Sequence, residues 1–137
     1  MKRFGLSLVC LTVFVGFVAA LWFVPRKPVL QAVEAADNPE LRCGWLNNPT
    51  PGNFWFTDKD GEWEIGSQGG YQAEGDAPDI PDSRMVKTNG PHGYGCACMK
   101  MTVDKKEKRV IRIFSGNSKP LSACRTDKAL KGKEPKE

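Results

Sequence analysis

The cysteines and the single histidine of this 137-residue chain are the side chains best suited to covalent or metal chemistry. Cys96 and Cys98 lie two apart in the stretch GYGCACMKM, four and six residues after His92. Such a group offers metal binding, thiol redox chemistry or disulfide bonding. Structural zinc sites favour paired C-x2-C spacings and redox centres favour C-x-x-C, and this stretch has neither. We therefore expect no metal and no cofactor. A nucleophilic pair of His92 with one of these thiols would require the thiol to be free, so that it can ionise to a thiolate.

The N-terminal sequence indicates which of these chemistries applies. Met1-Lys2-Arg3 precedes an uncharged, largely apolar run over residues 4–24. A positive start before such a run is typical of a signal peptide, and the run is also long enough for an uncleaved membrane anchor. We expect residues 1–36 to be a signal peptide or an anchor with a linker. The protein would then be exported to the periplasm or the cell surface, touching the membrane only through this segment.

Four cysteines remain when Cys10 in the leader is set aside: Cys43, Cys96, Cys98 and Cys124. An even number in a small exported domain predicts a disulfide framework. A bridge between Cys96 and Cys98 would close a strained ring across one residue. Two pairings stay open: Cys43–Cys96 with Cys98–Cys124, or Cys43–Cys98 with Cys96–Cys124. Each bridge would stabilise the fold by about 3–4 kcal/mol in the chain-entropy model.

The charge of the chain is concentrated at its two ends. The formal net charge is +4, but residues 37–137 carry only +1 and residues 37–127 carry −1. A nucleic-acid-binding protein needs a basic face to engage phosphates. We therefore expect no nucleic-acid partner.

Two hairpins are expected to position the cysteines and the aromatic residues. The stretch NFWFTDKDGEWEIG predicts two strands around a turn at residues 58–61, with Phe56 opposite Trp63 and Phe54 opposite Ile65 on the buried face. The other face would carry Trp55, Thr57, Glu62 and Glu64.

The second hairpin is predicted from CACMKMTVD, KKEK and RVIRIFS. Its alternation directs Met99 and Met101 into the core and both cysteines to the opposite face. Residues 67–89 are irregular and acidic, which predicts a long loop. One helical turn is expected near Cys124, followed by a disordered Lys-rich tail over residues 131–137.

We therefore predict a mainly β fold, with a small α+β fold as the variant. A compact antiparallel sheet of two hairpins, tied by two disulfides, would form a single domain over residues 37–130.

Three aromatic residues are the candidate binding residues: Trp45, Trp55 and Tyr71. Aromatic rings with a polar tip suit both glycans and protein partners. Trp45 lies beside Cys43, where core packing is the competing interpretation. Trp55 is the strongest candidate, because it is the aromatic residue on the Glu-bearing face of the first hairpin. No catalytic residue is predicted.

Three blocks of the chain resemble the bacterial exported family known as domain of unknown function 4087. They are CGWLNNPTPGNFWFTDKDGEWEIGSQGGYQA, KTNGPHGYGCACM and PLSACRTDKAL. The resemblance extends over residues 42–130, implies a bacterial cell-envelope protein, and agrees with a four-cysteine framework. It implies no activity.

These observations predict a non-catalytic binding module for a protein or wall-glycan partner. Its size, compartment and cysteine content suit an inhibitor or immunity protein against a wall hydrolase. The alternatives are a structural envelope protein and a small wall-active hydrolase that uses the hairpin carboxylates, of which Asp60 and Glu62 are the ones to test.

Overall fold

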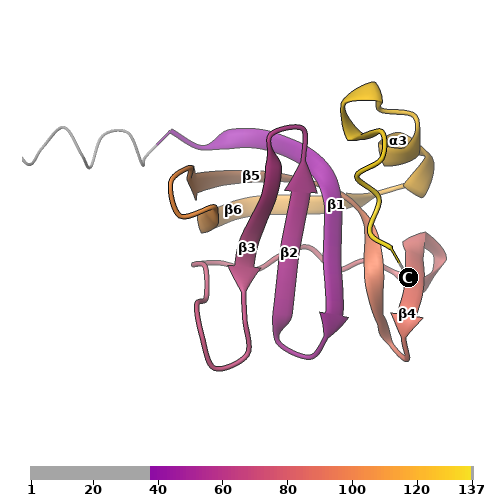
Figure 1. Ribbon diagram of the computed structural model, residues 1–137, viewed down its shortest axis with the longest axis horizontal. Helices are drawn as coiled ribbons and strands as arrows, with labels where there is room; N and C mark the ends of the chain where they lie inside the picture. Colours follow the sequence, from indigo (N-terminus) through magenta and orange to yellow (C-terminus); the bar gives the residue numbers. More distant parts are fainter. Residues whose placement is uncertain (1–37, 137) are drawn as a thin grey trace, which may run out of the picture. The chain divides into compact units, whose positions relative to one another are not determined.

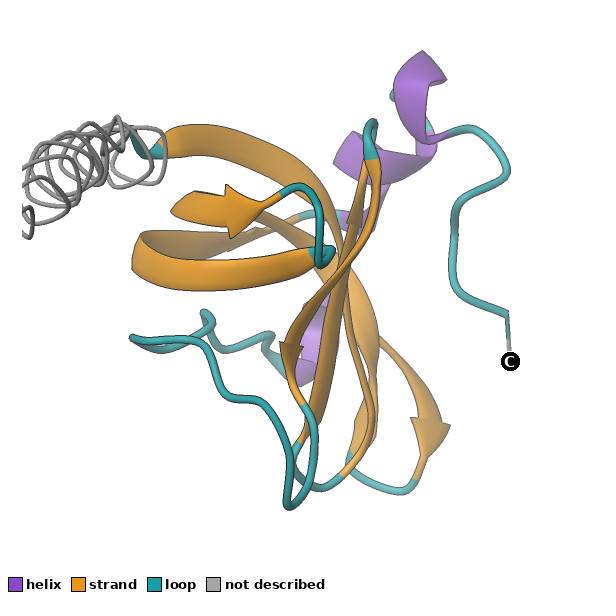
Figure 2. Cartoon of the chain, turned by 60° about the vertical axis from the view of Figure 1, so that its left-hand side comes forward, coloured by secondary structure: helices purple, strands orange, loops and turns teal. Residues whose placement is uncertain are grey.

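The computed structural model describes residues 38–136, and the predicted leader lies outside the described residues. The described part is mostly β (Figures 1 and 2), and none of its helices has the length and hydropathy needed to cross a bilayer. Its elements are β1 (Glu40–Thr50), β2 (Asn53–Asp58), β3 (Gly61–Gly66), η2 (Asp82–Arg84), β4 (Met85–Asn89), β5 (His92–Asp104), β6 (Arg109–Lys119), α3 (Leu121–Arg125) and η3 (Lys128–Leu130). The prediction of a mainly β fold built from two hairpins is confirmed.

The sheet of the described chain closes on itself. Its strand order is β1-β2-β3-β6-β5-β4, and β1 pairs with β5 as well. The strands β1, β2, β3, β6 and β5 therefore form a barrel, and β4 extends the sheet beside β5. Within residues 38–136 the strand pairs are antiparallel, except that β3 meets β6 in parallel at Glu64 and Arg109. The barrel strands have the order of an OB barrel, a likeness of topology alone.

The β2–β3 hairpin confirms the predicted pairing of Phe56 with Trp63. The second predicted pair is wrong by one residue, because an irregularity next to Trp55 sets Phe54 opposite Gly66 instead of Ile65. One extra residue in a strand produces such a shift. Phe54 still packs against the core.

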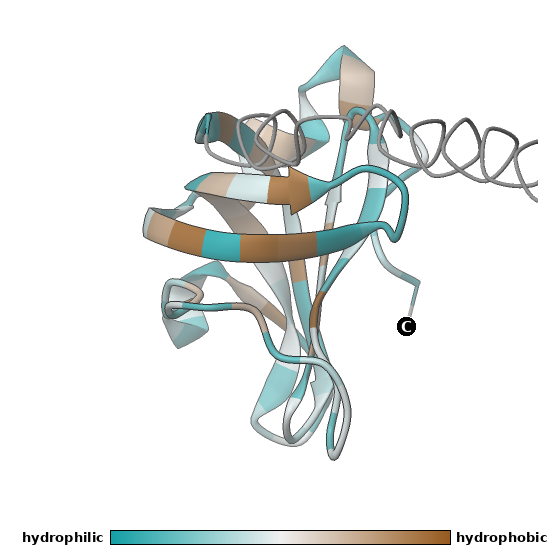
Figure 3. Cartoon of the chain, turned by 90° about the vertical axis from the view of Figure 1, so that its left-hand side faces the viewer, coloured by the Kyte–Doolittle hydropathy of each residue, from teal (hydrophilic) through white to brown (hydrophobic). Residues whose placement is uncertain are grey.

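The β5–β6 hairpin shows the predicted alternation of apolar and polar residues (Figure 3). Met99 and Met101 are fully buried in the barrel interior, in one cluster with Phe56 and Trp63. Cys96 is also buried, but in a different cluster. The predicted separation of the methionines from the cysteines is therefore confirmed.

A second apolar cluster lies on the outside of the barrel, beneath α3 and η3. It contains Trp45, Tyr94, Cys96, Cys124 and Leu130. Trp45 on β1 and Cys96 on β5 are directly paired, so that their side chains share one side of the sheet. The C-terminal segment lies beside β1 (Figure 1) and covers what would otherwise be an exposed apolar face.

The chain after Leu130, for which the sequence predicted disorder, makes defined contacts as far as Glu134. Arg125 donates to Glu134 at 2.8 Å, and the Tyr94 hydroxyl donates to the same carboxylate at 3.1 Å. The Lys133 ammonium donates to two backbone carbonyls of the β2–β3 turn, at 2.7 and 2.8 Å. The charged side chains of Lys133 and Glu134 therefore bind to groups of the domain.

Residues 67–84, which we call the strap, connect β3 to β4. The predicted loop over residues 67–89 ends earlier than expected, because Met85–Asn89 forms β4 against β5. Two glycines of the barrel, one on β5 and one on β6, allow the strap to pack closely against these strands. A Cβ on Gly95 would meet the Ile80 side chain at 2.5 Å, and one on Gly116 would meet Pro78 at 2.9 Å.

Candidate functional site

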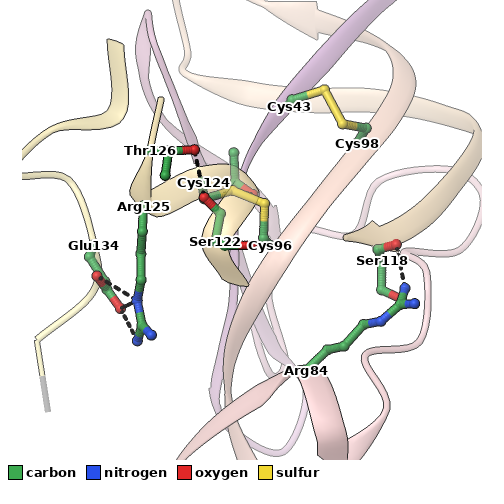
Figure 4. Close-up of a disulfide and its surroundings, with 11 residues drawn as sticks. Cys43, Arg84, Cys96, Cys98, Ser118, Ser122, Cys124, Arg125, Thr126 and Glu134 are labelled. Atoms are coloured by element: carbon green, nitrogen blue, oxygen red, sulfur yellow. Dashed lines mark hydrogen bonds and ion pairs between the residues drawn. A yellow bond between two sulfur atoms is a disulfide. The ribbon is translucent and has the colours of Figure 1, made fainter. Parts of the chain in front are cut away.

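The structure decides between the two disulfide pairings that the sequence left open. Cys43 is bonded to Cys98, and Cys96 is bonded to Cys124 (Figure 4). Cys43 and Cys98 are direct partners in the β1–β5 register, and Cys96 reaches α3 on the outside of the barrel. These thiols are therefore oxidised, and His92 has no thiolate to activate among them. Two disulfides are consistent with an oxidising compartment.

Trp45 contributes to the core and not to a surface. It is 1% exposed, and its ring lies nearly perpendicular to that of Tyr94 at a centroid distance of 5.7 Å. A side chain without exposed area cannot contact a partner. We therefore remove Trp45 from the candidate binding residues.

Trp55 and Tyr71, in contrast, lie at the two ends of one row on the outer face of the barrel. Trp55 on β2 pairs with Glu64 on β3, and Glu64 pairs with Arg109 on β6. The Arg109 guanidinium carbon lies 4.8 Å from the centre of the Tyr71 ring. Directly paired residues project to the same side of a sheet, so these side chains are neighbours. We call Trp55, Glu64, Arg109 and Tyr71 the aromatic row.

Polar contacts hold the row in place. Arg109 Nε donates to Glu64 Oε2 at 3.0 Å, and Ser67 Oγ donates to Glu64 Oε1 at 2.8 Å. The Tyr71 hydroxyl donates to the backbone carbonyl of Val110 at 2.8 Å. Both aromatic residues are half-buried, and 42% of the Arg109 side chain is exposed. The row thus presents ring surface and charged atoms from fixed positions.

The contacts of the row change its titration. The hydrogen bond from Ser67 and, after it, the hydrogen bond and charge of Arg109 lower the pKa of Glu64, although partial burial opposes them. Burial raises the pKa of Tyr71, and the charge of Arg109 opposes that shift. Glu64 is therefore ionised and Tyr71 protonated at neutral pH.

On acidification, Glu64 is expected to be protonated only at a pH below its ordinary pKa. Because its pKa is lower in the folded protein, the ionised carboxylate stabilises the fold above pH 4.5, the ordinary value, and this contribution is lost as the pH falls through the folded pKa. Replacing Ser67 by Ala should move the pKa of Glu64 back upward, and so should Arg109→Gln, which removes both a hydrogen bond and a positive charge. An NMR titration of the Glu64 side-chain carboxyl measures both shifts. Unchanged pKa values in the two variants would contradict the assignment of these contacts.

The other hairpin carboxylates have structural partners. Asp58 is 2% exposed and accepts hydrogen bonds from Arg42 at 2.6 Å and from the Trp63 indole at 3.0 Å. The hydrogen bond and charge of Lys59 and, after them, the hydrogen bond and charge of Arg42 lower the pKa of Asp60, although burial opposes them. The general acid of a glycosidase needs a raised pKa. Asp60 therefore does not supply such an acid.

Two arginines of these sites were not singled out from the sequence. Arg109 joins the row through a contact with Glu64 that spans 45 positions of the chain, and Arg42 meets Asp58 across 16. Neither arginine belongs to a local motif. A positive charge next to a predicted apolar strand was the available signal, and it does not identify a partner.

The aromatic row and the two bridges lie in the part of the chain that matches a known family. A family model described as "Protein of unknown function (DUF4087)" matches residues 37–131. The chain belongs to this family. The DUF4087 match includes all four bridged cysteines and the whole aromatic row. No curated protein and no solved structure matches this DUF4087 protein.

Proposed function

We propose that this DUF4087 protein is an exported, non-catalytic binding module of the bacterial cell envelope, which holds a wall glycan on its aromatic row. The observation that carries the proposal is the position of the row. Two aromatic rings and an ion pair cross three neighbouring strands on one outer face of a disulfide-tied barrel.

The topology favours this face. OB barrels bind oligonucleotides and oligosaccharides on the face of their second and third strands, and in this chain those strands are β2 and β3, which carry Trp55 and Glu64. This is an argument by analogy of fold, and the residues must support it separately. A net charge of −1 over residues 37–127 disfavours a phosphate backbone and leaves the oligosaccharide as the better ligand.

The chemistry of the row supports the same ligand class. A half-buried ring such as Trp55 offers an apolar surface to the face of a sugar, while Glu64 and Arg109 offer an acceptor and donors for hydroxyl groups. The closed sheet and the Cys43–Cys98 bridge fix the row before binding. A prearranged site loses less conformational entropy when it binds.

A protein is the competing ligand of the row. This chain would then act as an inhibitor or immunity protein that binds a wall hydrolase. Trp, Tyr and Arg are also the residue types that dominate protein interfaces. The experiment below therefore includes both classes of partner.

Replacing Trp55 by Ala is expected to weaken binding to purified peptidoglycan by roughly tenfold or more, a loss of about 1.4 kcal/mol for each factor of ten. The physical reason is the loss of the exposed ring surface from one end of the row. Sedimentation of the full-length protein with insoluble peptidoglycan over a concentration series measures the affinity.

Phe114→Ala is the matched control, because Phe114 is an aromatic residue that is 47% exposed outside the row. It should bind like the parent, and both variants should keep cooperative unfolding. If the parent does not sediment with peptidoglycan, the glycan proposal is wrong. Retention of a purified wall hydrolase by the parent and not by the Trp55 variant would then assign the row to a protein partner.

A further inference from the structure

A cleft of about 600 Å³ lies between the strap and the inner face of the β1–β3 strands. Its apolar wall includes Leu46, Phe54 and Ile65 from the sheet and Ala77 and Ile80 from the strap. This face of the molecule is separate from the aromatic row, because Phe54 and Ile65 belong to the interior cluster while Trp55 and Glu64 project outward. Small-molecule sites in proteins commonly measure about 300–1,000 Å³.

The walls of the cleft are fixed by backbone contacts. Glu74 in the strap donates its N–H to Ile111 at 2.9 Å and accepts from the N–H of Ile113 at 2.8 Å. Further along, Pro78 lies against Gly116 and Ile80 against Gly95, where a Cβ would collide with them. Figure 2 shows the strap passing in teal from the end of β3 to η2. The strap is thus attached at several points, and the cleft is formed without a ligand.

The mouth of the cleft is negatively charged. Its lining contains Asp76 and Asp79, both exposed, and no Lys, Arg or His. Within residues 38–136 neither of these carboxylates has a hydrogen bond or an ion-pair partner, whereas Asp82, further along the strap, pairs with Lys87 at 2.6 Å. Two uncompensated negative charges beside an apolar wall favour a ligand that carries a positive charge on an apolar body.

We infer that this cleft is a second binding site, which takes a small amphipathic organic cation such as an alkylammonium group. The alkyl chain lies against Phe54, Ala77 and Ile80, which are half-buried, and the ammonium group faces Asp76 and Asp79. Burial of the CH₂ groups removes apolar surface from water and so favours binding. The two carboxylates supply the preference for a cation over a neutral or anionic ligand.

The test uses three probes of equal chain length: hexylammonium, hexanol and hexanoate. Each is titrated into the isotopically labelled full-length protein at low ionic strength, and the methyl signals of Ala73 and Ala77 report binding. Hexylammonium is expected to bind about three- to tenfold more tightly than hexanol, because charge pairs at exposed positions are individually weak. Hexanoate is expected to bind most weakly.

The charge contribution is isolated by Asp76→Asn together with Asp79→Asn, a change at exposed positions that leaves the apolar wall intact. This variant should bind hexylammonium and hexanol alike, while the control Asp82→Asn should keep the preference for the cation. The inference is overturned if millimolar hexylammonium leaves both methyl signals unmoved. It is equally overturned if hexanol binds the parent as tightly, or if the double variant keeps the preference. None of these results depends on peptidoglycan binding by the aromatic row.

Discussion

Replacing Asp58 by Ala should lower the free energy of unfolding by about 3–5 kcal/mol, the usual cost of removing one partner of a buried ion pair. The side chains of Arg42 and Asp58 are only 5% and 2% exposed. Without Asp58, the Arg42 guanidinium loses its buried partner and keeps only the more exposed Glu40 and Asp60, and the Trp63 indole loses its acceptor. Arg42 also lies 4.8 Å from the centre of the Trp63 ring, so the change disturbs the end of the barrel core. Urea unfolding followed by circular dichroism measures the loss.

Asp60→Asn is the control for this change. Asp60 also contacts Arg42, at 3.0 Å, but its side chain is 41% exposed and water can replace it. Its variant should unfold at nearly the parental urea concentration. Replacing Arg42 and Asp58 together by Met and Leu should be less harmful than Asp58→Ala alone, because the Arg42 guanidinium is then removed together with its buried partner. Equal stability of the Asp58→Ala variant and the parent would show that the pair contributes nothing.

Removal of the Cys96–Cys124 bridge is the second change with a large expected effect. The double variant Cys96→Ala, Cys124→Ala should lose about 3–4 kcal/mol, as expected for a loop closed over 28 residues. In this variant, residues 121–130, which cover the second apolar cluster, should unfold before the barrel. A helix of five residues such as α3 has little stability alone. Hydrogen exchange is the measurement: the amides of residues 121–130 should lose protection before those of β5.

The other bridge provides the matched comparison. Cys43→Ala with Cys98→Ala should cost about 4 kcal/mol, because its loop spans 55 residues, but residues 121–130 should remain as protected as β5. If the two double variants show the same exchange pattern, the Cys96–Cys124 bridge does not hold residues 121–130 in place.

The local part of the fold was predictable from the sequence. Turn residues and the alternation of apolar side chains were enough to place Phe56 opposite Trp63 and Met99 in the core, because both depend on residues close in the chain. The same alternation placed Cys96 and Cys98 on one side of β5. Of the candidate binding residues, it placed Trp55 outside the core.

The non-local part was not predictable. β1 has turn-forming residues such as Gly44 and Pro49, so it did not appear as an 11-residue strand. Without β1 there was no β1–β5 register, and the choice of Cys98 over Cys96 as the partner of Cys43 depends on that register. The aromatic row likewise depends on one parallel contact of β3 with β6, which leaves no periodic signal in either strand.

The Cys43–Cys98 bridge also bears on how fast the barrel forms. It joins β1 and β5 where they are already in register, although the two residues are 55 positions apart. In an oxidised unfolded chain this separation is no longer a loop that has to be closed, so the pairing that completes the barrel becomes a local event. The bridge therefore lowers the effective contact order of a topology that would otherwise fold slowly. Early oxidation of this bridge is therefore a kinetic advantage as well as a source of stability.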